Sequence, residues 1–279
     1  MARKRIVVQE PMSRLALWAQ RCALLSLAAT VLVILFVRAG WVEAAPALGA
    51  MFGALGMAGV GILLALAALA VIWRDGVPGV GPALLAIFFG AAVLAYPAYL
   101  GTRYLRTPPI NDVSTDLQDP PRFEQAARFR PRGTADHPGG LTAELQRAAY
   151  PDLETLQVAA TPQIAFEAAR SVLAKRRWTI ILDRPPAANR DGQLEAVART
   201  LILGFREDVA VRIRSGADGV NIDVRSASRY GGHDLGSNAA RVRSLLEDID
   251  DAVAALLEAR QRQQQKSAPA KAPAQPAKR

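Results

Sequence analysis

The sequence has few of the residues that build disulfides and metal centres. Among its 279 residues there are one cysteine, Cys22, and two histidines, His137 and His233. A single cysteine excludes a disulfide within the chain, and too few zinc ligands of the usual types remain for a structural zinc site. We therefore expect no metal and no cofactor, and we expect both histidines to lie in loops.

Charge is missing from two long stretches, from Pro46 to Ile72 and from Val77 to Leu100. A third, shorter apolar stretch runs from Cys22 to Val37. Backbone groups in hydrocarbon must be paired within their own segment, so apolar stretches of this length predict membrane-spanning helices. We predict an all-α anchor of three transmembrane helices over residues 1–106, with spans at about 17–38, 46–73 and 77–101.

No acid or base lies deep in a predicted span, and this argues against a pump or an ion-coupled transporter. The bilayer is the one partner that the anchor requires. Glycines recur in the second span and permit close approach of helix backbones; they are Gly49, Gly53, Gly56 and Gly59. Two interpretations stay open for them: packing of the chain's own three helices, or the seam of a homodimer.

Basic residues predict the orientation. Residues 1–21 hold five of them, Arg3, Lys4, Arg5, Arg14 and Arg21, against the single acid Glu10. The positive-inside rule then places the N-terminus in the cytoplasm, and three crossings place the rest of the chain on the other side. For a bacterial inner membrane that side is the periplasm. Arg103 and Arg106 oppose this prediction, because they follow the third span.

The formal net charge of +9 is unevenly distributed. Residues 1–21 contribute five bases and one acid, and residues 258–279 contribute six bases and one acid. The middle of the chain is therefore neutral, whereas a nucleic-acid-binding domain would carry its basic excess on the folded part. We exclude nucleic acid as a partner. The Pro-, Ala- and Gln-rich composition of 258–279 predicts a disordered basic tail.

Residues 107–257 predict one soluble α+β domain. Thr161-Pro162 is typical of a helix start, with a hydroxyl cap before a proline at the first helical position. Apolar periodicity continues this helix to about Arg176. Four strands and two further helices are predicted at 178–183, 194–203, 209–214, 220–226, 141–149 and 238–257, with loop over most of 107–140. We expect a four-stranded, mainly antiparallel sheet with helices on one face.

Period-two alternation separates two faces of this sheet. Val209, Val211 and Ile213 point one way, toward the helices. The opposite face collects five arginines and two acids: Arg199, Arg212, Arg214, Arg225, Arg229, Glu195 and Asp223. One interpretation is a solvated face held by modest salt bridges. The other is a surface that binds an anion, because guanidinium groups match carboxylates and phosphates.

Two segments are unusually polar for loops: Pro109–Asp116, followed by Asp119-Pro120-Pro121, and Arg225–Asn238, with Arg241 one helical turn further on. Twelve residues in them are the candidate ligand-binding site: Asn111, Asp112, Ser114, Thr115, Asp116, Arg225, Ser226, Ser228, Arg229, Asp234, Asn238 and Arg241. These residues either brace the loops through side-chain to backbone bonds, or the acids of the first segment meet the arginines of the second in a polar pocket.

With the paired motifs IND-STD-DPP and RSxSR-G-D-G-N-R, the region of about residues 107–257 resembles an uncharacterised bacterial and plastid family catalogued as domain of unknown function 1499. Some members carry similar membrane spans ahead of the domain. The resemblance implies a domain boundary and marks residues of interest. It implies no activity.

The same residues bear on three other kinds of site. Asp112, Asp116 and Asp119 do not have the alternating spacing of a calcium loop. Hydrolysis by Ser226 or Ser228 needs a base, and adjacent His233 and Asp234 cannot form a relay by themselves. The glycines of 231–236, at the start of the last helix, form either an anion cradle or a tight turn.

The leading hypothesis is a non-enzymatic, membrane-anchored periplasmic domain that binds an anionic ligand or an envelope partner. A second is an enzyme of unknown class that uses Asp112 or Asp116 with the arginines. A third is a structural accessory of a membrane complex, in which the glycine-rich second span would matter most.

Overall fold

The computed structural model describes residues 11–130, 133–217 and 219–267. The chain separates into two units. One is built from the three helices that precede Pro108 and also includes Thr200–Phe205, and the other is built around a sheet. Each unit is described by itself.

Three long helices form the first unit: α1 (Arg14–Ala39), α2 (Ala44–Asp75) and α3 (Val80–Arg106). The turns between them are short, and α1 and α2 each end at a glycine in the left-handed conformation that glycine adopts without steric cost. The start of α1 lies beside the start of α3, because Ser13 donates its N–H to the carbonyl of Pro78. The three helices therefore run up, down and up.

Small residues fill the inside of this bundle, and large apolar residues cover its outside. The buried positions are alanine and glycine for the most part, such as Ala23, Gly61 and Ala86, whereas Leu63 and Phe88 are about two-thirds exposed. A water-soluble bundle shows the reverse, whereas lipid is as apolar as leucine and helices in it associate through close packing. All three helices are long and apolar enough to cross a membrane, as predicted.

The four glycines singled out in α2 do not pack against the chain's own helices. A Cβ atom added to Gly49, Gly53, Gly56 or Gly59 would meet nothing within 4 Å. Close approach occurs instead at Gly61, against backbone atoms of Ala19 and Ala23, and at Gly90, against Ile62 and Ala58. The interpretation that those four glycines serve packing within the chain is therefore wrong, and they lie on the outer face of α2.

The second unit contains an antiparallel sheet with strand order β1-β6-β5-β4-β3, and β2 also pairs with β6. Its strands are β1 (Asp112–Ser114), β2 (Leu156–Val158), β3 (Thr179–Arg184), β4 (Gly192–Arg199), β5 (Arg206–Gly216) and β6 (Gly219–Ser228). β1 and β2 lie end to end along the same edge of β6, because Asp112 is opposite Ala227 and Leu156 is opposite Ile222.

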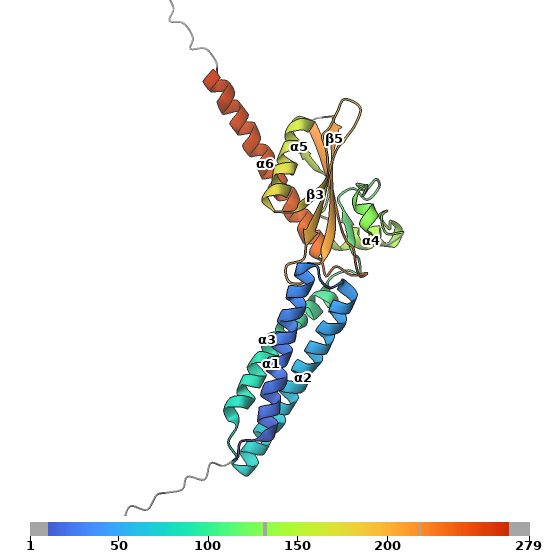
Figure 1. Ribbon diagram of the computed structural model, residues 1–279. Coiled ribbons are helices and arrows are strands. Elements are labelled where there is room, and N and C mark those ends of the chain that lie inside the picture. Colours follow the sequence, from blue (N-terminus) through green and yellow to red (C-terminus); the bar gives the residue numbers. More distant parts are fainter. Residues whose placement is uncertain (1–10, 131–132, 218, 268–279) are drawn as a thin grey trace, which may run out of the picture. The chain divides into compact units, whose positions relative to one another are not determined.

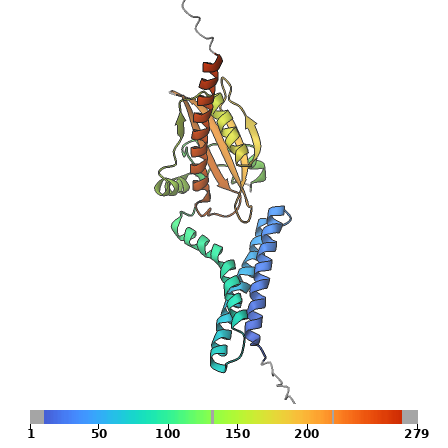
Figure 2. The same ribbon diagram turned by 90° about the vertical axis from the view of Figure 1, so that its left-hand side faces the viewer.

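Helices α5 (Pro162–Lys175) and α6 (Ser237–Ser267) cover one face of the sheet, and Figures 1 and 2 show them side by side in one layer. Thr161 caps α5 through its hydroxyl, which accepts the N–H of Ile164. Helix α4 (Gly140–Ala149) lies on the opposite side of the sheet, beside β1 (Figure 1). A short 3-10 helix, η1 (Ala126–Phe129), lies between β1 and α4 in the chain.

The main core of this unit lies between the sheet and the two helices. Val209, Val211 and Ile213 of β5 are buried there against Leu173 of α5 and Leu245 of α6. The alternation of β5 and β6 therefore has the predicted direction, and the α+β class is confirmed.

The sheet has six strands rather than the four predicted. Strands β1 and β2 were missed because each is three residues long, too short to show alternation, and each pairs only with β6. β4 ends at Arg199 instead of about residue 203. α6 continues past Leu257 to Ser267, so the predicted disordered tail is helical over 258–267, and residues 268–279 lie outside the described residues.

Candidate functional site

The second face of the sheet is covered by the segment of residues 115–130, which runs from the end of β1 through η1. Glu195, Asp223 and Arg225 have at most 1% of their surface exposed. Phe123 and Ala126 from the covering segment pack on Ala210 and Ala227 of the sheet. The expectation of a solvated face is therefore wrong for Glu195, Asp223 and Arg225, which are buried beneath residues for which only loop was predicted. Arg199, at the end of β4, is exposed.

Asp112 and Arg225 form a buried ion pair across the β1–β6 ladder. Arg225 donates from Nε to Asp112 Oδ1 over 3.0 Å and from Nη2 to Oδ2 over 2.7 Å, the two-pronged geometry that guanidinium and carboxylate favour. Its third nitrogen, Nη1, donates to the carbonyl of Pro121. The guanidinium carbon lies 4.3 Å from the centre of the Phe123 ring, so an aromatic face shields the pair from water.

Asp208 holds two further arginines on this face. Arg229 donates to it from Nε and Nη2, and Arg130 donates to it from Nη1 over 2.9 Å. All three side chains are at most 5% exposed. Arg130 also binds the carbonyls of Ala227 and Ser228. These contacts tie the covering segment to the end of β6.

Three aspartates surround two more arginines of the face, Arg212 and Arg214. Arg212 and Arg214 each donate to Asp223 and to Asp116, over 2.9 to 3.1 Å. Arg212 also reaches Asp119, which is 61% exposed and is the outermost member of the group. Although burial raises the pKa of Asp116, the N–H groups of Asp119 and Gln118 and the charge of Arg212 outweigh it and lower that pKa.

Glu195 is the one acid of this face whose contacts come mainly from the backbone. Its carboxylate accepts the N–H groups of Glu124, Gln125 and Ala126, at distances from 2.6 Å upward, at the start of η1. Burial raises the pKa of Glu195, and the three N–H donors only partly offset that effect. Glu195, on β4, therefore holds the start of η1 against the sheet.

Asn238, buried at the start of α6, joins the two polar segments. Its Oδ1 accepts hydrogen bonds from Ser226 and Arg241, and its Nδ2 donates to the backbone carbonyl of Asn111 and to the hydroxyl of Ser228. All four hydrogen-bonding positions of one side-chain amide are thus satisfied inside the protein.

Arg241 lies on the helix side of the sheet and binds Glu207, Ser226 and Asn238. Burial, together with the charge of Arg176, lowers the pKa of Arg241 to about 10. The guanidinium stays protonated at neutral pH, so its role is that of a fixed donor.

Asp234 occupies the position proposed for an anion cradle. Its carboxylate accepts the N–H groups of Gly236 and Asn238 over 2.8 Å each, at the start of α6. Burial raises the pKa of Asp234, and those two donors oppose the rise. Two N–H groups at the helix start, which have no partner within the helix, are thus bound by the carboxylate of Asp234. This agrees with the interpretation of the segment as a tight turn.

The remaining residues of the first segment also bind within the protein. The N–H and C=O of Ser114 are both bound by the Gln146 amide from α4. The Thr115 hydroxyl accepts the N–H of Val224, and the Asn111 amide binds the carbonyl of Gly231. The twelve predicted residues therefore come together, but as two sets on opposite faces of β6 rather than around one pocket.

In the part of the chain that the structure describes, these residues form neither a metal site nor a serine relay. Among the residues that the structure describes, no group of three or more His, Cys, Asp or Glu side chains is placed to hold a metal ion. Ser226 donates to Asn238 and accepts from Arg241, and Ser228 donates to Glu207. His233 Nδ1 accepts the N–H of Leu235, so it stabilises its own turn.

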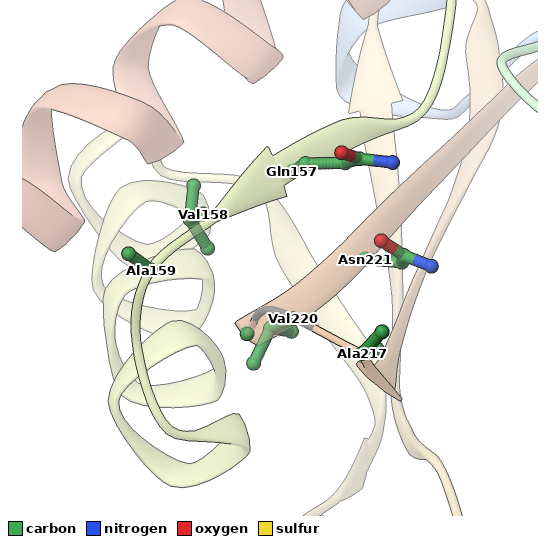
Figure 3. A pocket seen from close by; sticks show the side chains of 8 residues that line it. Gln157, Val158, Ala159, Ala217, Val220 and Asn221 are labelled. Carbon is green, nitrogen blue, oxygen red and sulfur yellow. The ribbon is translucent and has the colours of Figure 1, made fainter.

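Two shallow hollows lie away from these residues. One, of about 310 Å³, lies between β2 and the β5–β6 hairpin, where the Gln157 and Asn221 amides point to the same side (Figure 3). The other, of about 490 Å³, lies between the start of α5 and the loop of residues 186–191. Neither is lined by any of the twelve.

Several members of the buried network were not predicted. Asp208 is one residue before the alternating Val209, so period two alone would have placed it on the arginine face. Glu207 would have fallen on the helix face, where Arg241 meets it. Arg130 and Phe123 gave no signal, because they reach the site from a segment without periodic structure. Gln146 lies on the predicted helix α4, but its sequence did not indicate that it would bind Ser114.

Comparison with known proteins bears on this unit alone. Residues 112–249 match the model of a family described as "Protein of unknown function (DUF1499)". No curated protein and no solved structure matches the chain. The matched range begins at β1 and ends within α6, so it includes the whole sheet, the second polar segment and the first polar segment from Asp112 onward.

Proposed function

We propose that this chain, whose residues 112–249 are a DUF1499 domain, is a non-enzymatic module of the bacterial inner membrane that joins an envelope complex. Its N-terminus lies in the cytoplasm and its sheet unit in the periplasm. The five bases and one acid of residues 1–21, followed by three crossings, support this placement.

A non-enzymatic role is supported by the state of the polar residues. Asp112, Asp116 and the serines of β6 are hydrogen-bonded to other side chains of the protein. A general base or nucleophile has to reach a substrate atom, and these groups are buried or paired. An enzyme that uses Asp112 or Asp116 with the arginines would have to break its own ion pairs before each turnover.

A protein partner is supported over an anionic ligand by the charge balance of the arginine face. Arg212, Arg214, Arg225 and Arg229 are each paired with an aspartate of the same unit. An anion that bound there would have to displace one of those carboxylates. The most exposed of them, Asp119, belongs to a group in which three acids already surround two arginines.

The observation that carries the proposal is the outer face of α2. Gly49, Gly53 and Gly56 lie on one side of that helix, and a Cβ atom added at any of them would have no atom of the described residues within 4 Å. Glycine costs stability in a helix interior, yet at this spacing it allows a second helix to approach closely. The face therefore fits a helix from outside the chain, contributed by another subunit or by a second copy.

The test replaces glycines on two different helices. Gly53→Leu and Gly56→Leu should abolish co-migration of the full chain with its partner on native gels of solubilised membranes. Gly81→Leu, at an outward glycine of α3 that also has nothing within 4 Å, should leave the complex intact. A complex that survives both α2 substitutions contradicts the proposal.

Two differently tagged copies separate the possible partners. If the two tagged copies of the wild-type chain co-purify and the Gly53→Leu copies do not, the partner is a second copy of the chain. If the wild-type chain instead co-purifies with a different protein that is lost in Gly53→Leu, the partner is an unlike subunit. Placement is tested independently by reporters at the C-terminus. Alkaline phosphatase, which needs periplasmic disulfides, should be active and green fluorescent protein dark. The opposite result would place the sheet unit in the cytosol.

A further inference from the structure

The last part of helix α3, which contains Pro97, leaves the bundle (Figure 2). Proline inside a helix removes a backbone hydrogen bond and kinks the chain. The last buried residue of α3 is Val93, and Figure 2 shows the end of this helix leaning away from α1. The final turns are consequently exposed on most sides, and Tyr99 and Tyr104 have half or more of their surface uncovered.

Two tyrosines and two arginines share one stripe of this segment. Tyr99, Arg103 and Arg106 follow Tyr96 by three, seven and ten residues, which places all four on one face of a helix. The rings of Tyr96 and Tyr99 are 6.3 Å apart, and Arg103 Nη1 donates to the Tyr99 hydroxyl over 3.1 Å. A tyrosine hydroxyl therefore orients one side of the Arg103 guanidinium.

The stripe has the depth profile of a membrane interface. Tyrosine rings favour the boundary between acyl chains and headgroups. At about 1.5 Å of rise per residue, Arg103 lies about 6 Å beyond Tyr99, at the level of lipid phosphates. Arginine side chains in such positions keep an apolar stem in the acyl region and extend the charged head outward.

Charge at this end of the bundle also favours an anion. The end of α1, the start of α2 and the end of α3 contribute Arg38, Arg103 and Arg106 against one acid, Glu43. These arginines lie on the side where the positive-inside rule expects few bases. Binding of an anionic ligand explains the presence of these arginines, whereas the positive-inside rule does not.

We infer that the Tyr96–Arg106 stripe of α3 is a binding site for the headgroup of an anionic phospholipid, with Arg103 holding the phosphate beside the Tyr99 hydroxyl and Arg106 holding the outer part of the headgroup. The site requires that α3 spans a bilayer, and the argument from charge also rests on the proposed placement of this end of the bundle at the periplasmic side. It is independent of any partner at α2. Phosphatidylglycerol has the required chemistry, whereas phosphatidylcholine has the phosphate but carries a compensating cation.

The experiment uses the full chain, delipidated in a neutral detergent and titrated with phosphatidylglycerol or phosphatidylcholine under native mass spectrometry. Wild-type protein should bind phosphatidylglycerol about fivefold more tightly for each engaged arginine. Arg103→Gln should reduce that preference by about fivefold, and Tyr99→Phe should reduce it less. Arg74→Gln, at the opposite end of the bundle and paired with Asp75, is the matched control and should change nothing.

Equal affinity of the wild-type chain for the two lipids, or an unchanged preference in Arg103→Gln, would overturn the inference. Inorganic phosphate distinguishes a lipid from a free anion, because it should not compete at the lipid concentration used. Competition by phosphate would assign the arginines to a soluble ligand instead.

Discussion

Arg225 and Asp112 meet through two parallel hydrogen bonds, of 3.0 and 2.7 Å, with both side chains at most 4% exposed. The pair joins a strand of three residues to the longest hairpin of the sheet. So short a strand has few backbone hydrogen bonds of its own. A buried charge pair at its first residue therefore makes its position in the sheet specific.

Removal of one member of this pair should be costly. Asp112→Ala leaves the Arg225 guanidinium buried without its carboxylate, and we expect the free energy of unfolding to fall by about 3–5 kcal/mol. Urea unfolding of the full chain, followed by Trp178 fluorescence after Trp18, Trp41 and Trp73 are changed to Phe, measures the loss. Arg170→Gln is the control: its pair with Asp183 is exposed and should contribute less than about 1 kcal/mol.

Replacement of both partners by apolar residues should cost much less than replacement of one. Asp112→Leu combined with Arg225→Met removes both buried charges, and buried pairs are often replaceable in this way. If the double variant recovers most of the stability lost in Asp112→Ala, the ion pair serves to fix the position of β1 rather than to stabilise the fold. A double variant as unstable as the single one would mean that the arginine is needed for its contacts with Pro121 and Phe123.

Asn238 should be the most sensitive uncharged position of the network. Asn238→Ala removes four hydrogen bonds and leaves the buried hydroxyls of Ser226 and Ser228 short of a partner. Each buried group left unsatisfied costs about 1–3 kcal/mol, so a loss of at least about 2 kcal/mol is expected in the same urea assay. Gln163→Ala removes an exposed amide of α5 and should be close to neutral. Equal effects of the two would argue against a hub at Asn238.

His137 should make the sheet unit less stable in mild acid. Burial lowers the pKa of this imidazole below its ordinary value of 6.5; the charge of Asp112 opposes the shift and that of Arg225 adds to it. Below about pH 6.5 the unfolded chain therefore binds a proton that the folded chain does not. The contribution of His137 to stability is then lost as the pH falls from 6.5 to the pKa of His137 in the folded chain, and His137 causes no further loss below that pKa.

The measurement compares unfolding at about pH 7.5 and at about pH 5.5 in wild type and in His137→Asn. The asparagine oxygen can still accept the N–H of Gly139, as His137 Nδ1 does. A smaller loss of stability in the variant is the expected result. Parallel pH profiles would assign the acid sensitivity to other groups.

Gly90 should tolerate no larger side chain. A Cβ atom there would lie 2.7 Å from Ile62 Cγ1 and 3.3 Å from the carbonyl oxygen of Ala58. Gly90→Leu should therefore separate α3 from α2 and lower the melting temperature of the bundle in detergent, measured by circular dichroism. Gly81→Leu, where nothing lies within 4 Å, should leave it unchanged. Overpacking of a close interface costs about 1–3 kcal/mol.

The parts of the fold that were predictable have a strong period. The three apolar helices, the Thr161 helix start and the Val209–Ile213 alternation repeat one signal over many residues. β1 and β2 do not, because three residues give no period, and their partner β6 is far away in the chain. The end of α6 was missed for a related reason: residues 258–267 lack the apolar stripe that a docked helix shows.

The candidate site was predicted as a set of residues but not as an arrangement. The polar motifs identified Asp112, Arg225, Asn238 and Arg241, and the pairing of Asp112 with an arginine was one of the two interpretations left open. Burial was not predictable from the sequence of residues 115–130, because proline-rich, turn-rich segments usually lie in solvent. Here such a segment covers a sheet face, since Glu195 and Asp208 supply the acceptors that its backbone and Arg130 need.

Asp234 belongs to a sequence motif, RSxSR-G-D-G-N-R, whose polar residues here serve the fold rather than a ligand. It fills the N–H groups at the start of α6 with a carboxylate from the same chain, so the geometry that elsewhere holds a phosphate is here already occupied. Any other sequence with this pattern of aspartate, glycine and asparagine before a helix would inherit the turn without inheriting a substrate. Proteins that share this motif would then have to differ in what they bind through surface residues outside it.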